Sequence, residues 1–250
     1  MLIGSAYSAI LLSLRVGPVF AFAPPFTLVR LPMLFRLLFS LAISAALVAS
    51  NPAQAMIRET SAAAIIVIAA RELLLGMIFV VAFQLTFAAL QVAGRTVDIQ
   101  AGFGLSLLID PATRNNVPLV GTLFVYACAA IFFAADGHVE LLQIMAASID
   151  AIPLGSYVIS FSAANLAAFM SAVFVAAFGV AGGAILALFI TDLAITMLSR
   201  TVPQMNVLVL GFQVKTIVLL LVLPISLGAS GALLMRMTRI TLEALPQLLL

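Results

Sequence analysis

The stretch SAAAIIVIAARELLLGMIFVVAFQLTFAALQVA, Ser61–Ala93, decides the fold class of this chain. It is longer than the roughly 20 apolar residues that one helix needs to cross a membrane, and its charged residues are the adjacent Arg71 and Glu72. The rest of the chain is similar, because 65% of its 250 residues are hydrophobic and 8% are charged. A soluble domain carries about a quarter charged residues. So few charges cannot cover a water-soluble surface, and we expect an integral membrane protein with a single membrane-embedded domain, residues 1–250.

Apolar runs predict an all-α fold of hydrophobic helices or helical hairpins, with about six spans, some of them long and kinked. Two of the runs are too long for one simple span. In the first, Arg71 and Glu72 indicate either the membrane surface or a buried ionic contact. In the second, the segment GVAGG, Gly179–Gly183, is a kink, the turn of a hairpin or a close-packing face. The six runs are Ile3–Ala23, Pro32–Ala49, Ser61–Ala93, Val117–Ala135, Tyr157–Leu198 and Val207–Leu227.

Two further helices are expected from local patterns. The segment ADGH, Ala135–His138, is typical of a helix start, with Asp136 as the capping residue. Near the C-terminus, Arg236, Arg239 and Glu243 are spaced three and four residues apart. This spacing predicts that they share one face of an amphipathic helix.

The sequence offers little for catalysis, metals or cofactors. His138 is the single histidine and lies in a turn, where a loop or capping role is the ordinary one. Asp98, Asp110 and Asp192 lie near apolar segments, but none has the GxGD setting of an intramembrane protease. Cys128 is one cysteine inside an apolar run, and the net charge of +2 does not favour a nucleic-acid partner. We therefore expect no enzyme and no cofactor.

The segment AGFGLSLLIDPATRNNVPLVG, Ala101–Gly121, combines glycines, a bulky apolar knot and helix-breaking residues. Non-helical backbone beside membrane spans persists only inside protein or around a cavity. One reading is an ordinary loop that links two helices. The other is an apolar plug on a glycine hinge, made of Gly102, Phe103, Gly104, Leu105, Leu107, Leu108, Asp110 and Pro111.

The segment RTVPQMNVLVLGFQVK, Arg200–Lys215, places polar residues between two apolar runs. Pro203 suits the first turn of a new helix. From there Gln204, Gly211 and Lys215 would share one face, while Asn206 and Gln213 would share the opposite one. A helix with two polar faces in this setting contacts neighbours on both sides, in this chain or in other subunits. The predicted subunit-packing residues are Arg200, Pro203, Gln204, Asn206, Gly211 and Lys215.

This last segment resembles the R-type export-gate family of type III secretion systems, in its flagellar form. The resemblance extends in order along most of the chain, through a set of short motifs of which none is decisive alone. They are the N-terminal Arg15 and the APP turn, RELLLG at Arg71–Gly76, IDP at Ile109–Pro111, DGH at Asp136–His138, and IPLGS at Ile152–Ser156. The flagellar form is favoured over its T-type injectisome counterpart because PQMN is followed by GF and then Lys215.

The resemblance implies a structural and gating subunit of the flagellar protein export apparatus. One copy would assemble with P-type and Q-type subunits into a helical, pore-forming ring, beside A-type and B-type components. Unfolded flagellar proteins would pass through the pore as transient substrates. The expected location is the bacterial inner membrane at the flagellar basal body, and the Gly102–Pro118 loop would lie in the channel. The alternatives are the injectisome T-type subunit, and less favoured, a secondary transporter or an intramembrane enzyme.

Overall fold

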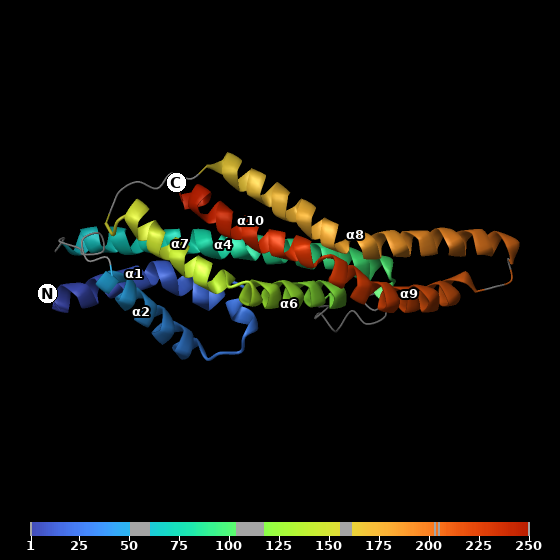
Figure 1. Cartoon of the computed structure of the whole chain (residues 1–250), viewed down its shortest axis with the longest axis horizontal. Helices are drawn as coiled ribbons and strands as arrows, with labels where there is room; N and C mark the ends of the chain where they lie inside the picture. Colours follow the sequence, from blue (N-terminus) through green and yellow to red (C-terminus); the bar gives the residue numbers. More distant parts are fainter. Residues whose placement is uncertain are drawn as a thin grey trace. The chain divides into compact units, whose positions relative to one another are not determined.

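A computed structural model describes residues 2–50, 61–103, 118–155, 162–202, 204 and 206–249 of the chain. Within these residues every regular element is a helix (Figure 1), which confirms the all-α prediction. The elements are α1 (Leu2–Phe22), the short 3-10 helix η1 (Phe26–Leu28), α2 (Met33–Ser50), α4 (Ala62–Gln100), α6 (Leu119–Ala134), α7 (Gly137–Ala151), α8 (Ala163–Thr201), α9 (Val207–Ala229) and α10 (Gly231–Leu249).

The predicted number of spans is confirmed. Among the described residues, five helices are long and apolar enough to cross a membrane: α1, α2, α4, α8 and α9. The count becomes six if α6 and α7 form one span, broken by a bend of 70° at residues 135–136. The chain is a polytopic membrane protein.

The two overlong apolar runs are each one continuous helix. Both α4 and α8 contain 39 residues, and a straight helix of that length is about 58 Å long. Gly179–Gly183 therefore lies inside α8 and is not the turn of a hairpin. A Cβ atom at Gly183 would lie 3.1 Å from Ser226 Oγ of α9. The absence of a side chain at Gly183 therefore lets α8 and α9 pack closely at this point.

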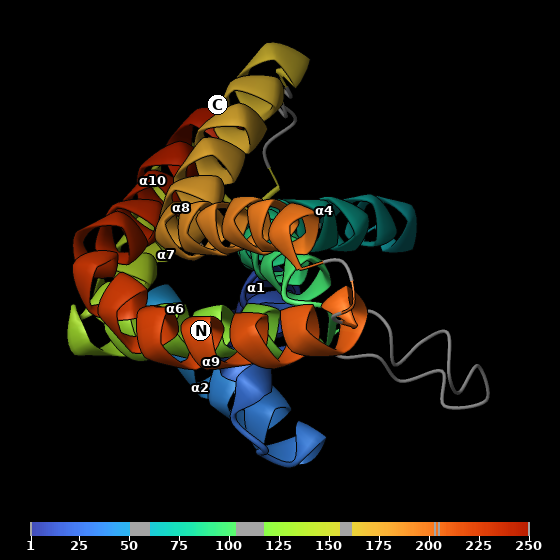
Figure 2. The same cartoon turned by 90° about the vertical axis from the view of Figure 1, so that its right-hand side faces the viewer.

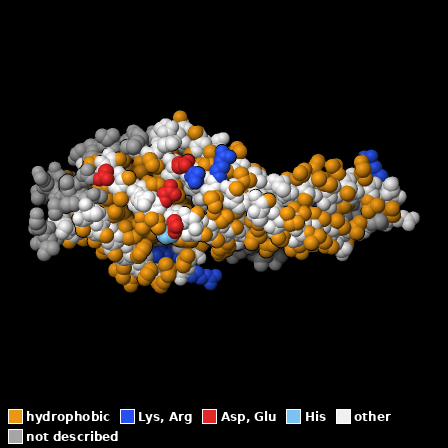
Figure 3. Space-filling model, in the orientation of Figure 1, with side chains coloured by type: hydrophobic (Ala, Val, Ile, Leu, Met, Phe, Trp, Pro, Cys, Tyr) orange, Lys and Arg blue, Asp and Glu red, His pale blue; other side chains and the backbone are white. Residues whose placement is uncertain are grey.

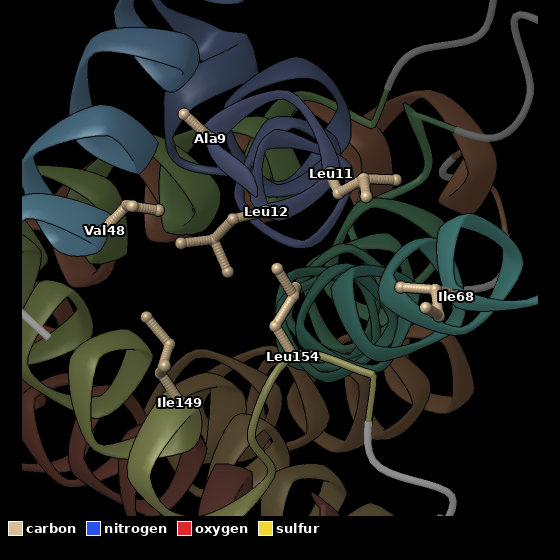
Figure 4. Packing of buried hydrophobic residues seen from close by; sticks show 7 residues of the cluster. All are labelled: Ala9, Leu11, Leu12, Val48, Ile68, Ile149 and Leu154. Carbon is tan, nitrogen blue, oxygen red and sulfur yellow. The ribbon is translucent and has the colours of Figure 1, made fainter. Parts of the chain in front are cut away.

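The chain divides into two compact units. The first unit comprises Met1–Thr86, Phe132–Met170 and Arg239–Leu250. In it, α2 folds back beside α1 as a hairpin (Figures 1 and 2). Its core includes a cluster of seven buried apolar side chains contributed by α1, α2, α4, α7 and the turn after α7 (Figure 4): Ala9, Leu11, Leu12, Val48, Ile68, Ile149 and Leu154.

The second unit comprises Phe87–Ile131 and Ser171–Thr238. In this unit α4 and α6 cross closely, at Gly94 of α4 and Gly121 of α6. A Cβ atom at Gly94 would lie only 2.2 Å from Gly121 Cα, so the two backbones touch where both side chains are absent. Cys128 lies further along α6 and is fully buried, as the apolar run around it predicts.

Of the two helices predicted from local patterns, α7 gives one correction and α10 gives one confirmation. Asp136 stands before α7 as expected, but its backbone is left-handed (φ 56°) and its side chain makes no capping hydrogen bond, so the predicted cap is wrong. Gly137 follows at a point where a Cβ atom would lie 2.6 Å from the Phe132 ring. In α10 the prediction is confirmed: the three charged side chains are exposed, and Leu234, Leu242, Leu245 and Leu248 are buried.

The exposed surface is unusually apolar. On the face shown in Figure 3, hydrophobic side chains predominate and charged ones are few. Large exposed apolar residues extend along α4 from Ile66 (68% exposed) to Ile99 (60% exposed). Along a straight helix these two residues are about 50 Å apart.

Candidate functional site

The site that the sequence singles out lies at the C-terminal end of α4, in the second unit. Gly102 and Phe103, the first two residues of the predicted plug, are described and directly follow α4. The other predicted plug residues lie outside the described residues: Gly104, Leu105, Leu107, Leu108, Asp110 and Pro111. The structure therefore defines the two ends of this loop, at Phe103 and Pro118.

The first end is held against α9. Gly102 has a φ of +92°, in the left-handed region that side chains rarely adopt. A Cβ atom there would also lie 3.1 Å from the Phe212 ring of α9. The Phe103 ring meets Phe212 edge-on, with the ring centroids 6.3 Å apart. Gly102 is thus required by the local conformation and by the neighbouring ring, in addition to any hinge function.

Polar contacts hold the same end of α4. The Nζ atom of Lys215 donates to the Gln100 carbonyl oxygen at 3.2 Å and forms an ion pair with Asp192 of α8 at 2.5 Å. The Gln100 side-chain amide donates to the Ile185 carbonyl of α8 at 3.2 Å. One lysine therefore joins α4, α8 and α9. A charge within an apolar segment is stable when it is paired in this way.

The second end of the loop is held by Asp98. Both carboxylate oxygens accept from the backbone N–H of Val120 at 3.2 Å. Val120 is in the first turn of α6, where free N–H groups and the helix dipole favour a negative charge. Asp98 is 6% exposed. Together with the crossing of Gly94 over Gly121, this contact fixes the start of α6 on the same stretch of α4 that carries the first end.

The predicted packing residues fall into two groups. Gly211 is buried and Lys215 is half-buried, and both contact other helices of this chain. Arg200, Gln204 and Asn206 are exposed, and Pro203 lies outside the described residues.

The expected start of the helix at Pro203 is wrong. The helix α9 begins at Val207, so Gln204 is in the preceding turn and does not share a helical face with Gly211 and Lys215. Asn206 is the N-cap, and its side chain accepts from the Val209 N–H at 3.3 Å. This contact satisfies an N–H at the helix end, and it explains the Asn residue without a partner subunit.

A second polar centre lies in the first unit and joins α1, α4 and α7. The guanidinium of Arg15 donates to both carboxylate oxygens of Glu72, at 2.7 and 3.0 Å. It also donates to the backbone carbonyls of Ser148 and Ile152, each at 3.0 Å. Arg15 is 1% exposed and Glu72 is 2% exposed. The sequence predicted that Arg71 and Glu72 mark either the membrane surface or a buried ionic contact, and Glu72 forms such a contact with Arg15.

These contacts include residues that the sequence did not mark as functional, namely Gln100 and Phe212. Gln100 acts through its backbone carbonyl, which no side-chain pattern reveals. The pairing of Asp192 with Lys215 had a signal, since the two residues have opposite charges in consecutive apolar segments. Among the described residues, no group of three or more His, Cys, Asp or Glu side chains is arranged to hold a metal ion.

Comparison with known proteins identifies the family. Residues 6–240 match the family described as "Bacterial export proteins, family 1". The chain is 30% identical over 187 residues to the flagellar biosynthetic protein FliR of Bacillus subtilis (strain 168), covering 73% of this chain and 72% of the relative. It is 26% identical over 146 residues to FliR of Escherichia coli (strain K12), covering 58% and 56%. It is also 27% identical over 170 residues to the Yop proteins translocation protein T of Yersinia pestis, covering 67% and 65%. The chain thus belongs to family 1 of the bacterial export proteins.

Proposed function

We propose that this chain is a structural and gating subunit of the flagellar type III protein export apparatus. Its residues 1–250 function together as a single membrane-embedded domain in the bacterial inner membrane, at the flagellar basal body. It assembles with P-type and Q-type subunits into the export pore, beside A-type and B-type components, and unfolded flagellar proteins pass through as transient substrates. The family supports an export component. The flagellar form is supported by the Bacillus subtilis relative, which is 30% identical over 73% of this chain, although the Escherichia coli relative and the Yersinia translocation protein are about equally identical, at 26% and 27%.

The observation that carries assembly is the exposed apolar surface of α4. Ile66 and Ile99 are both more than half exposed and stand about 50 Å apart along a straight helix. The hydrocarbon core of a bilayer is about 30 Å thick. To place both side chains in lipid, the helix would need a tilt of roughly 53°, and helices in membranes tilt by 0–40°. Some of this surface therefore requires another protein to cover it.

The gating role belongs to the loop between Phe103 and Pro118. A pore wide enough for an unfolded polypeptide also passes ions unless something seals it at rest. Leucine and phenylalanine side chains suit a seal, because a narrow apolar constriction expels water. The fixed ends support this role: contacts of Phe212, Lys215 and Asp98 hold both ends on α4, so that the loop can be displaced without unpacking the helices.

Assembly and sealing have separate tests. The tagged chain is co-expressed with the P-type and Q-type subunits of the same genome and purified in detergent. We expect all three in one complex, and a chain that purifies alone would refute the assembly.

The seal is tested with Leu105→Gly/Leu108→Gly, which should assemble normally and make membranes permeable to small ions. The matched control Leu105→Met/Leu108→Met keeps two apolar side chains and should stay tight. If the glycine variant assembles and its membranes do not leak, the loop is not the seal.

A further inference from the structure

A stripe of exposed side chains runs along the part of α4 that belongs to the second unit. Successive turns of the helix contribute to it, three or four residues apart, so its members share one face: Ala88, Gln91, Val92, Arg95 and Ile99. Val92 and Ile99 are apolar and are 43% and 60% exposed. A charge and an amide therefore stand on the exposed face of an apolar helix, where polar groups need a partner.

Neither polar side chain has a partner in this chain. Among the described residues, the Arg95 guanidinium forms no ion pair and no hydrogen bond, and the Gln91 side-chain amide forms no hydrogen bond. A guanidinium carries five N–H donors and no acceptor, and the amide adds two more donors. Because Arg95 and Gln91 are one helical turn apart, a single acceptor group can contact both.

The described part of the second unit has no carboxylate left for Arg95. Its acidic residues are Asp98 and Asp192. Asp98 is buried and accepts from the Val120 N–H, and Asp192 pairs with Lys215. Lys215, which contacts the same end of α4, thus has an acidic partner in its own chain, whereas Arg95 does not.

A lipid headgroup is the alternative partner, because a long basic side chain near a helix end can extend to the membrane surface. Two observations favour protein. Ile99 is apolar and one turn nearer the end of α4, so a headgroup contact at Arg95 would place this 60% exposed side chain in the headgroup layer as well. The exposed surface of α4 is also longer than a bilayer can cover, and the stretch with an unpaired charge is the part least suited to lipid.

We propose that this stripe is the docking site for an apolar helix of a partner subunit, and that this helix presents one Asp or Glu carboxylate to Arg95 and Gln91. Val92 and Ile99 pack against apolar side chains on either side of that carboxylate. An arginine and a carboxylate form two parallel hydrogen bonds, which fix the register of the two helices as well as the choice of partner. The inference rests on the proposed assembly with other subunits and adds the chemistry of one contact.

The test is the recovery of the P-type and Q-type subunits with the tagged chain in detergent. Arg95→Met keeps an extended side chain and removes its charge. It should lower the recovery of the contacting subunit at least tenfold, because the partner's carboxylate is left without its counter-charge. Arg95→Glu should lower the recovery further, and Gln91→Leu should lower it less. The matched control is Arg236→Met, which removes the same charge from another exposed helical position of the second unit and should recover both subunits as the wild type does.

The isolated chain tests for a merely structural role of Arg95. Because Arg95 has no partner among the described residues, Arg95→Met without the other subunits should lose its helicity on heating at the wild-type midpoint. A lower midpoint would mean that Arg95 stabilises its own chain, and it would contradict the proposal.

Charge reversal identifies the carboxylate. In the Arg95→Glu background, each Asp and Glu in the apolar helices of the P-type and Q-type subunits is changed to Arg, one at a time. One of these changes should restore the recovery of both subunits, because it rebuilds the pair with its charges exchanged. If none of them restores it, no such ion pair exists and the proposal is wrong.

The outcomes separate this contact from the assembly on which it rests. A wild-type complex that Arg95→Met and Arg95→Glu leave intact refutes the contact alone, and it would mean that Arg95 faces lipid headgroups or water. A wild-type chain that purifies without either subunit refutes both the assembly and the contact. An equal loss in Arg236→Met would mean that overall charge governs the recovery, and it would overturn the contact as well.

Discussion

Replacing Gly94 with alanine adds one methyl group where α4 crosses α6 in the second unit. The new Cβ atom would lie 2.2 Å from Gly121 Cα and 2.3 Å from Gly121 N. Both atoms belong to the backbone of α6, so no side chain can turn away to make room. An ordinary contact needs about 3.4 Å. The two helices must therefore move apart by about 1.2 Å at the crossing.

The expected change in the free energy of unfolding follows from two opposing effects. A gap of 0.5–1 Å already removes a quarter to a half of the dispersion energy of each contact along the crossing, and overpacking of this kind costs about 1–3 kcal/mol. Alanine inside a helix gains about 0.5–1 kcal/mol over glycine from backbone entropy. We expect Gly94→Ala to lower the free energy of unfolding on balance.

The matched control is Gly182→Ala in α8, because a Cβ atom there meets nothing within 4 Å. This variant should gain stability from the entropy effect alone. The two alanine variants should differ by about 2 kcal/mol, which corresponds to midpoints about 4–8 °C apart in a chain of this size.

The measurement uses Cys128, the single cysteine of the chain. It is fully buried in α6, the helix that Gly94 touches, and becomes reactive only when this region opens. A fluorogenic thiol reagent added during heating reports the midpoint. The reasoning fails if Gly94→Ala unfolds at or above the midpoint of Gly182→Ala, because the helix contact would then not limit stability.

Three further outcomes are expected. Glu72→Met should lower the midpoint of helicity loss on heating more than the double change Arg15→Met/Glu72→Met does. Removing one partner of a buried ion pair costs about 3–5 kcal/mol, whereas replacing both partners costs little. Equal midpoints would show that the pair is not coupled. Asp98→Ala leaves the backbone N–H in the first turn of α6 without its acceptor and should lower the free energy of unfolding by about 1–3 kcal/mol. Asp98→Asn keeps an acceptor oxygen and should lower it less in the same heating experiment. Identical losses of stability in the two variants would contradict the role of that bond. A cysteine at Arg239 should react quickly with a water-soluble maleimide while one at Leu245 is protected, and equal rates would mean that α10 has no polar face.

The positions of the helices could be predicted from the sequence because the length and the hydrophobicity of an apolar run are properties of the run itself. The run Pro32–Ala49 became α2, Met33–Ser50, with its ends displaced by one residue. The two long runs were harder. Hydropathy indicates that a helix avoids water, but it does not tell lipid from protein as the cover. Whether 39 residues form a hairpin or one helix therefore depends on neighbours that the run itself does not contain.

The candidate site was predicted in part for similar reasons. Gly211 and Lys215 were recognised as unusual residues in an apolar segment, and both pack against other helices. The acceptor that Lys215 uses on α4 is a backbone carbonyl, so side-chain chemistry could not identify it. The helix start was assigned to Pro203 on its fixed φ angle, although Asn206 is the stronger signal. An asparagine that caps the helix satisfies an N–H group, whereas a proline only tolerates the position.

The length of α4 also affects the steady-state amount of this protein in a cell. A copy made without its partners has apolar side chains, from Ile66 to Ile99, that a bilayer cannot cover all at once. Such surface is a target for aggregation and for quality-control proteases. We expect orphan copies to be short-lived, and the steady amount of the chain to follow the supply of its partners and not its own rate of synthesis.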